Sequence, residues 1–195
     1  MSPTDANAIV SCLRTSLSEF WSGQLNEVVD QPVVVEPASA QVPRQCRSAI
    51  TTTAAFTCQV DNTVYLNSGL IDAARHDFPA AEEPYVFAAV LGHEIGHVVQ
   101  ATVKQPGYDD STNSDEISRR IEQQADCLDG VWAHSAIAAR QLDRATFIRV
   151  TNTYLTSISS NPEIVTHGTP PQRAAALAKG LKNGRPQDCG LATFS

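Results

Sequence analysis

Apolar residues recur every four positions near the start of the chain, which is the spacing of one face of an amphipathic helix. They are Ile9, Leu13, Leu17 and Trp21. Thr4 or Asp5 stands where a side chain can cap the first turn. The pattern therefore predicts a helix over residues 5–22.

The segment from residue 31 to residue 67 has a different pattern, with short apolar runs between polar residues. Val33–Val35 is a β-branched run, and Ala55–Val60 and Thr63–Leu66 follow it. The last two runs are separated by Asp61-Asn62, a pair that suits a hairpin turn. We expect a small β-sheet in the first third of the chain.

The remainder of the chain has mainly helical periodicity. Helices are predicted over Glu82–Val103, from the cap Ser114 towards Arg140 with a bend at Gly130, over Asp143–Ile158 and over Pro171–Leu181. Loops are predicted at Gln105–Asn113, at Asn161-Pro162 and at Gly168–Pro171. The expected fold class is α+β and mostly helical, in one domain covering residues 1–195.

Composition narrows the class of protein. The chain has 195 residues, 42% of them hydrophobic and 18% charged, which is typical of a globular domain. Its net charge of -7 argues against nucleic acid or anionic lipid as the main partner. No apolar run reaches the roughly 18 residues that span a bilayer. The start of the chain lacks the basic region of a signal peptide. The oligomeric state stays open.

Five residues on a predicted helix carry the strongest chemical signal: His93-Glu94-Ile95-Gly96-His97. His93 and His97 are four positions apart, so both imidazoles share a face and can reach one ion. Zinc in catalytic sites is held by such donors and keeps one position for water. Glu94 is placed to take a proton from that water. The alternative is a helix that merely contains two histidines; a helical glycine, Gly96, speaks against it because it is costly unless something approaches closely.

A third ligand is needed, and the next predicted helix offers Glu122 and Asp126, again on one face. Glu122 can complete the ligand set. Asp126 can accept the second ring N–H of a ligand histidine and so fix its tautomer. The alternative for such a pair is a solvated helix face, but the residues around it are weakly charged.

The segment Thr166-His167-Gly168-Thr169, followed by Arg173, is the third element of the candidate site. Peptide hydrolysis needs a cation or a hydrogen-bond donor near the developing oxyanion. His167 and Arg173 are both candidates for that role. Equally, they can be a loop histidine and a helix-capping arginine.

The five cysteines contain no CxxC pair, so a thiolate metal site is not expected. Cys46 and Cys58 flank a short polar stretch, and Cys127 and Cys189 can join a helix to the C-terminal segment. Two disulfides would indicate an oxidising compartment, hence an extracytoplasmic or secreted protein, with Cys12 left over. The alternative is five thiols in a cytoplasmic protein.

Taken together, several segments resemble the bacterial neutral zinc metallopeptidase family over roughly residues 40–195. They are HEIGHVVQ, RRIEQQADCLDGVW, THGTPPQR and a cysteine near the end. The motif order is also similar to that of the Ste24/HtpX-type peptidases. The resemblance implies a zincin-like fold of the glutamate-ligand (gluzincin-like) type that holds one Zn²⁺ per chain. It also implies that a strand before Tyr65-Leu66-Asn67 can pair with an extended peptide.

The resemblance also implies a role for each candidate residue. His93, His97 and Glu122 would be the zinc ligands and Glu94 the general base. Asp126 would support a ligand, and His167 and Arg173 would stabilise the transition state.

The sequence therefore predicts a zinc endopeptidase that acts on peptides or proteins. Two alternatives stay open. One is an inactive zinc-site module for binding or assembly, and the other is a zinc amidase for small amides.

Overall fold

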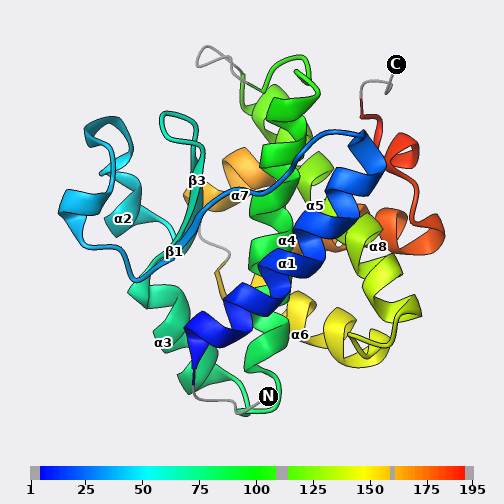
Figure 1. Cartoon of the computed structure of the whole chain (residues 1–195), viewed down its shortest axis with the longest axis horizontal. Coiled ribbons are helices and arrows are strands. Elements are labelled where there is room, and N and C mark those ends of the chain that lie inside the picture. The colour runs from blue at the N-terminus through cyan, green and yellow to red at the C-terminus, as the bar shows by residue number, and fades with distance from the viewer. Residues whose placement is uncertain (1–4, 109–113, 159–160, 192–195) are drawn as a thin grey trace. The chain divides into compact units, whose positions relative to one another are not determined.

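The computed structural model describes residues 5–108, 114–158 and 161–191. The chain forms two compact units, Met1–Val98 and Val99–Ser195. The helix α4 (Glu83–Thr102) is continuous across the boundary between them. Each unit is described in turn (Figure 1).

The first helix, α1 (Ala6–Leu25), forms where the apolar periodicity predicts it. Asp5 caps it by accepting hydrogen bonds from the backbone N–H groups of Asn7 and Ala8. Asn26 ends it in the left-handed conformation, with φ of 53°. The four periodic residues are buried, and they are Ile9, Leu13, Leu17 and Trp21. The prediction for this segment is confirmed.

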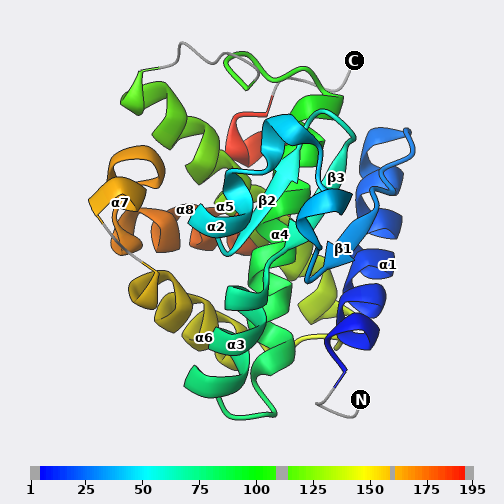
Figure 2. The same cartoon turned by 90° about the vertical axis from the view of Figure 1, so that its left-hand side faces the viewer.

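A three-stranded sheet follows α1, in the order β1-β3-β2. The strand β1 (Val33–Val35) pairs parallel to β3 (Thr63–Leu66), and β2 (Ala55–Cys58) pairs antiparallel to β3 (Figure 2). The strand β2 ends two residues before the predicted end at Val60, because the turn begins at Gln59. Asn62 in that turn is left-handed, with φ of 58°.

The segment between β1 and β2 contains two 3₁₀ turns, η1 (Ser39–Gln41) and η2 (Arg44–Cys46), and the short helix α2 (Ala49–Thr52). It packs on the sheet through an apolar cluster built on Val42, Cys58 and Tyr65. The cluster keeps this long connection in place beside the strands.

Two helices complete the first unit. The helix α3 (Ser68–Asp77), which the sequence pattern did not predict, buries Leu70, Ile71 and Ala74. The helix α4 matches the predicted helix to within one residue at each end. Most of its side chains are buried, including Phe87, Leu91 and Ile95. Burial on nearly all sides explains why apolar residues fill most positions of α4 between its few polar ones.

The second unit is helical. It contains the end of α4, then α5 (Asp115–Ala138), α6 (Arg144–Ser157), α7 (Asn161–His167), α8 (Pro170–Asn183) and the 3₁₀ turn η3 (Pro186–Cys189). Ser114 caps α5, as predicted, and Asp143 caps α6. The helices α7 and α8 both pack on α5 (Figure 2).

Two glycines allow α5 and α8 to approach each other closely. A Cβ atom on Gly130 would collide with the backbone carbonyl of Leu177, and one on Gly180 would collide with that of Cys127. The helix α5 runs unbroken through Gly130, where the sequence suggested a bend. The glycine therefore serves interhelical packing.

The predicted loop at Asn161-Pro162 is wrong, because α7 begins at Asn161. A proline in the first turn of a helix loses no hydrogen bond, since the N–H groups of that turn have no intrahelical partner. His167 is consequently the last residue of a helix rather than a loop residue.

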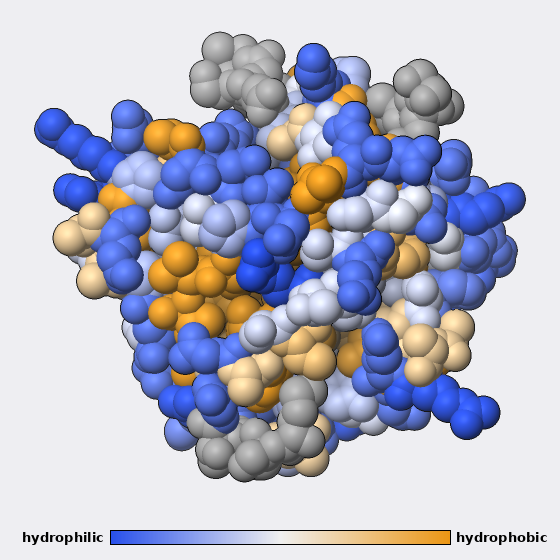
Figure 3. All heavy atoms as spheres, viewed as in Figure 1, coloured by the Kyte–Doolittle hydropathy of each residue, from blue (hydrophilic) through white to orange (hydrophobic). Residues whose placement is uncertain are grey.

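The face shown in Figure 3 is largely hydrophilic. The described residues with large, exposed apolar side chains are Val28, Val60 and Val165. Among the described residues, no helix is both long enough and apolar enough to cross a membrane.

Candidate metal centre and active site

His93 and His97 lie one turn apart on α4. Their ring centroids are 4.8 Å apart and the rings are nearly perpendicular, at 87°. His93 is only 9% exposed. Neighbouring imidazoles in this arrangement can present their nitrogens to one ion, as the spacing predicts.

Glu94 makes a hydrogen bond that the sequence analysis did not predict. The hydroxyl of Thr57, in β2, lies 2.7 Å from Glu94 Oε2 and 3.1 Å from the Glu94 carbonyl oxygen. The Glu94 residue is 7% exposed. The alternation of β2 could have shown that Thr57 faces away from Phe56 and Cys58, but not what it faces.

Side-chain amides tie the last turn of α4 to α5. Gln100 donates through Nε2 to the Ile121 carbonyl, at 2.8 Å, and to Gln124 Oε1, at 2.9 Å. Gln124 in turn donates to the Cys189 carbonyl at 3.2 Å. Gln100 is fully buried. These bonds hold the segment that contains Glu122 against the last turn of α4.

Glu122 lies beside His167, with its Oε2 atom 3.2 Å from His167 Nε2. Both side chains are partly exposed, at 20% and 28% respectively. Two residues of α5 hold the end of α7 that carries His167. Arg119 donates to the Val165 carbonyl at 2.6 Å, and Gln123 donates to the His167 carbonyl at 3.4 Å.

Asp126 and Arg173 form a buried ion pair with two parallel hydrogen bonds. Arg173 Nε lies 2.9 Å from Asp126 Oδ2, and Nη2 lies 2.8 Å from Oδ1. Burial alone would lower the pKa of Arg173. The charge and hydrogen bonds of Asp126, with a contribution from Glu122, outweigh burial, so the pKa of Arg173 is raised. The guanidinium is therefore permanently charged and held on Asp126.

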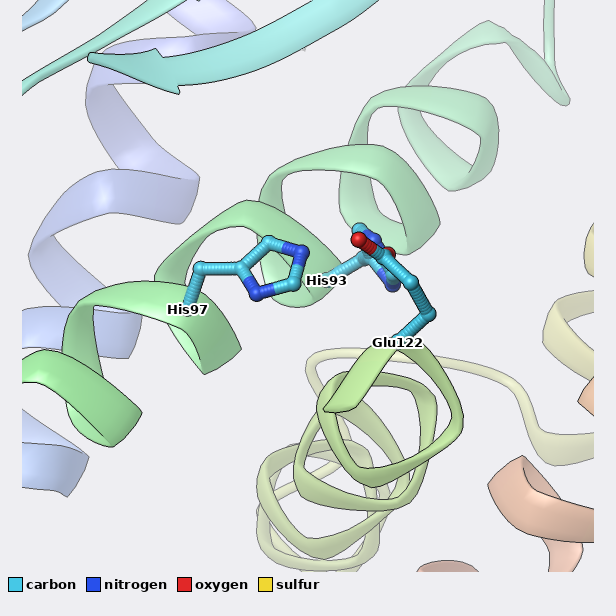
Figure 4. A group of neighbouring side chains, drawn as sticks. All are labelled: His93, His97 and Glu122. Carbon is cyan, nitrogen blue, oxygen red and sulfur yellow. The ribbon is translucent and has the colours of Figure 1, made fainter. Parts of the chain in front are cut away.

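The structure brings together three of the predicted residues as a possible metal-binding group. One ligand atom from each of His93, His97 and Glu122 lies within 4.8 Å of the other two (Figure 4). Two imidazole nitrogens and one carboxylate oxygen are donors that zinc accepts, and they leave a fourth tetrahedral position. The donor set therefore fits zinc.

Both predicted disulfides are present. Cys46 joins Cys58, with a Cα–Cα distance of 6.0 Å, and Cys127 joins Cys189, with a distance of 5.7 Å. Cys12 is a free, exposed cysteine. Paired disulfides are characteristic of extracytoplasmic proteins.

Two imidazoles and one carboxylate that leave a position for water form a donor set found in catalytic zinc sites. The chain belongs to the family described as "Putative neutral zinc metallopeptidase", which matches residues 3–194. The family expected from the sequence motifs is thereby confirmed.

Curated relatives align with nearly the whole chain. The chain is 26% identical to "Uncharacterized protein YpfJ" of Escherichia coli (strain K12), over 95% of this chain and 71% of that protein. It is 29% identical to "Uncharacterized protein Rv2575" of Mycobacterium tuberculosis (strain H37Rv), over 98% of this chain and 73% of that protein. No solved structure matches the chain.

Proposed function

We propose that this chain is a zinc-dependent endopeptidase that hydrolyses peptide bonds with Glu94 as its general base. One observation carries the proposal: the grouping of His93, His97 and Glu122 within 4.8 Å, on a helix that also carries Glu94. Family membership supports the same class of enzyme.

His93, His97 and Glu122 would hold one zinc ion per chain. When bound, zinc supplies Lewis acidity, which makes water a nucleophile near neutral pH and polarises the substrate carbonyl. Glu94 would accept the proton of the attacking water. It would then deliver a proton to the amine that leaves when the peptide bond breaks.

The oxyanion that forms during attack needs a positive or hydrogen-bonding partner. His167 is the better placed candidate in this chain, because its Nε2 atom lies 3.2 Å from the proposed ligand Glu122. Arg173 is 7% exposed and makes two hydrogen bonds to Asp126. Because its charge is paired with Asp126, Arg173 would contribute mainly by holding Asp126 in place on α5.

The substrate would be an extended peptide. Peptides can add a strand to a sheet edge through backbone hydrogen bonds. The strand before Tyr65-Leu66-Asn67 is β2, which lies at an edge of the sheet, whereas β3 has neighbours on both sides. The edge strand β2 is the better candidate, since Thr57 in that strand reaches Glu94.

The test compares the wild-type protein with Glu94→Gln. Zinc per chain is measured by elemental analysis, and cleavage is measured on a denatured protein substrate. We expect both proteins to contain one zinc and Glu94→Gln to lose at least about 10²-fold in activity, the usual contribution of a general base. Glu116→Gln, at an exposed position in the first turn of α5, is the matched control.

Equal cleavage by wild type and Glu94→Gln would contradict the mechanism. One zinc per chain with no turnover on any peptide library would instead favour a binding or assembly module. Turnover of small amides alone would favour an amidase. The two disulfides support an extracytoplasmic location for the active protein.

A further inference from the structure

We propose that Thr57 is a positioning residue that orients the Glu94 carboxylate for proton transfer. The inference rests on the proposed function, because it assigns Glu94 the role of general base. It adds a residue outside the zinc-binding motif, on the strand that lies beside it.

The distances from Thr57 Oγ1 indicate which oxygen of Glu94 accepts its hydrogen bond. A hydroxyl has one proton to donate, and Thr57 Oγ1 lies 2.7 Å from Glu94 Oε2 but 3.1 Å from the Glu94 carbonyl oxygen. Hydrogen bonds from a hydroxyl to a charged carboxylate are short and roughly twice as strong as neutral ones. Thr57 therefore occupies Oε2, and Oε1 is the oxygen directed to the proton of the attacking water.

Thr57 is itself held firmly. In the ladder between β2 and β3 it lies opposite Val64. The residues on either side of it point to the opposite face, as strand geometry requires. Phe56 stacks on Tyr65 with ring centroids 5.2 Å apart, and Cys58 is bonded to Cys46. A threonine is also restricted at χ1 because its Cβ is branched.

The consequence is a fixed general base. A glutamate side chain has considerable rotamer freedom, and burial alone does not select which carboxylate oxygen points to the water. The Thr57 hydroxyl selects it before substrate arrives. Misplacing a reacting group by about 1 Å can cost roughly a hundredfold in rate. Loss of the hydroxyl should therefore lower kcat and leave KM unchanged.

The experiment uses the full chain with zinc bound and three variants. Thr57→Val removes the donor at nearly constant shape, and Thr57→Ser keeps it. Thr53→Val removes an exposed hydroxyl from the same segment, one that bonds the Ala49 carbonyl instead. Zinc content, kcat and KM on a peptide substrate, and crystal structures of the wild type and of both Thr57 variants without added substrate are measured.

We expect Thr57→Val to keep one zinc, to lose about ten- to a hundredfold in kcat with KM within twofold, and to show a displaced Glu94 carboxylate. Thr57→Ser should recover most of kcat, and Thr53→Val should match the wild type. An unchanged kcat, a loss that Thr57→Ser fails to recover, or an undisplaced carboxylate would each overturn the proposal. If wild type cleaves no peptide, the proposed function fails, while the crystal structures still test the bond.

Discussion

Arg173 of α8 donates two hydrogen bonds to the Asp126 carboxylate of α5, and both side chains are less than 10% exposed. Asp126 lies one turn after Glu122, so both residues share a face of α5. The ion pair thereby fixes the rotation of the helix that presents Glu122.

The first prediction follows from the burial of this pair. Asp126→Asn should lower the free energy of unfolding by about 3–5 kcal/mol, because the Arg173 charge is then left buried without its partner. Arg173→Lys keeps the charge and should lower the free energy of unfolding by a smaller amount. Lysine does not replace arginine here, since it cannot form the two parallel bonds. Chemical denaturation measures the change.

The exposed pair between Arg185 and Asp188 provides the control for that prediction. Arg185→Lys should leave the stability nearly unchanged, because water screens the pair. If Arg185→Lys and Arg173→Lys lowered the free energy of unfolding by similar amounts, the role assigned to burial would be contradicted.

The two disulfides should contribute unequally. Cys127 and Cys189 are 62 residues apart, whereas Cys46 and Cys58 are 12 apart. The loop-entropy relation gives about 4 kcal/mol for the longer loop and about 3 kcal/mol for the shorter. Replacing Cys127 and Cys189 by serine should therefore lower the denaturant midpoint more than replacing the other pair. A larger drop in the denaturant midpoint on removing Cys46 and Cys58 would show that native-state contacts, rather than loop length, determine how much each disulfide stabilises the fold.

Helix packing gives a prediction with an internal control. Gly180→Ala should destabilise the chain strongly, because its Cβ would collide with the backbone at Cys127 and Val131. Gly23→Ala, also in a helix, should stabilise it by up to about 1 kcal/mol, because alanine is the better helix former and nothing lies within 4 Å of the added atom. Thermal unfolding tests this: the melting temperature should fall in Gly180→Ala and rise in Gly23→Ala.

Tyr65 should weaken the fold at alkaline pH. Burial, together with its hydrogen bond to Asp61 and the charge of that carboxylate, raises the pKa of Tyr65 from 10.0 to about 12. The neutral phenol is thus favoured in the folded state. The contribution of Tyr65 to the free energy of unfolding is complete below about pH 10, the pKa of an unfolded tyrosine. This contribution is lost as pH rises towards 12.

Denaturation at a series of alkaline pH values tests this expectation. Tyr65→Phe should be less stable than the wild type near neutral pH, and the difference should shrink as pH rises towards 12. A constant difference would contradict the raised pKa of Tyr65.

Much of the fold could be predicted because local patterns decide it. The periodicity of α1 and the cap at Ser114 identified two helices. The helix α3 was missed because it is short: in ten residues, the helical spacing of Leu70, Ile71 and Ala74 has little room to repeat. The helix α7 was missed because Asn-Pro is more common in turns than in helices.

The candidate site likewise contains features that local sequence patterns predict and features that they do not. The spacing of His93 and His97 required only helix geometry, so the sequence was sufficient. The hydrogen bond from Thr57 to Glu94 joins residues 37 positions apart and depends on which way β2 faces. The pairing of Asp126 with Arg173 likewise depends on how α8 packs on α5. Contacts of this kind follow from tertiary packing, which no local pattern encodes.

The disulfide between Cys127 and Cys189 also has a consequence for biosynthesis. During synthesis from the N-terminal side, Cys12, Cys46, Cys58 and Cys127 are all made before η3, which carries Cys189, so Cys127 stays unpaired until that segment is made. During that interval Cys12, exposed and unpaired in the finished fold, competes for oxidation. Cys12→Ser should therefore increase the yield of correctly bonded protein, measured as the ratio of native to scrambled species after expression in an oxidising compartment.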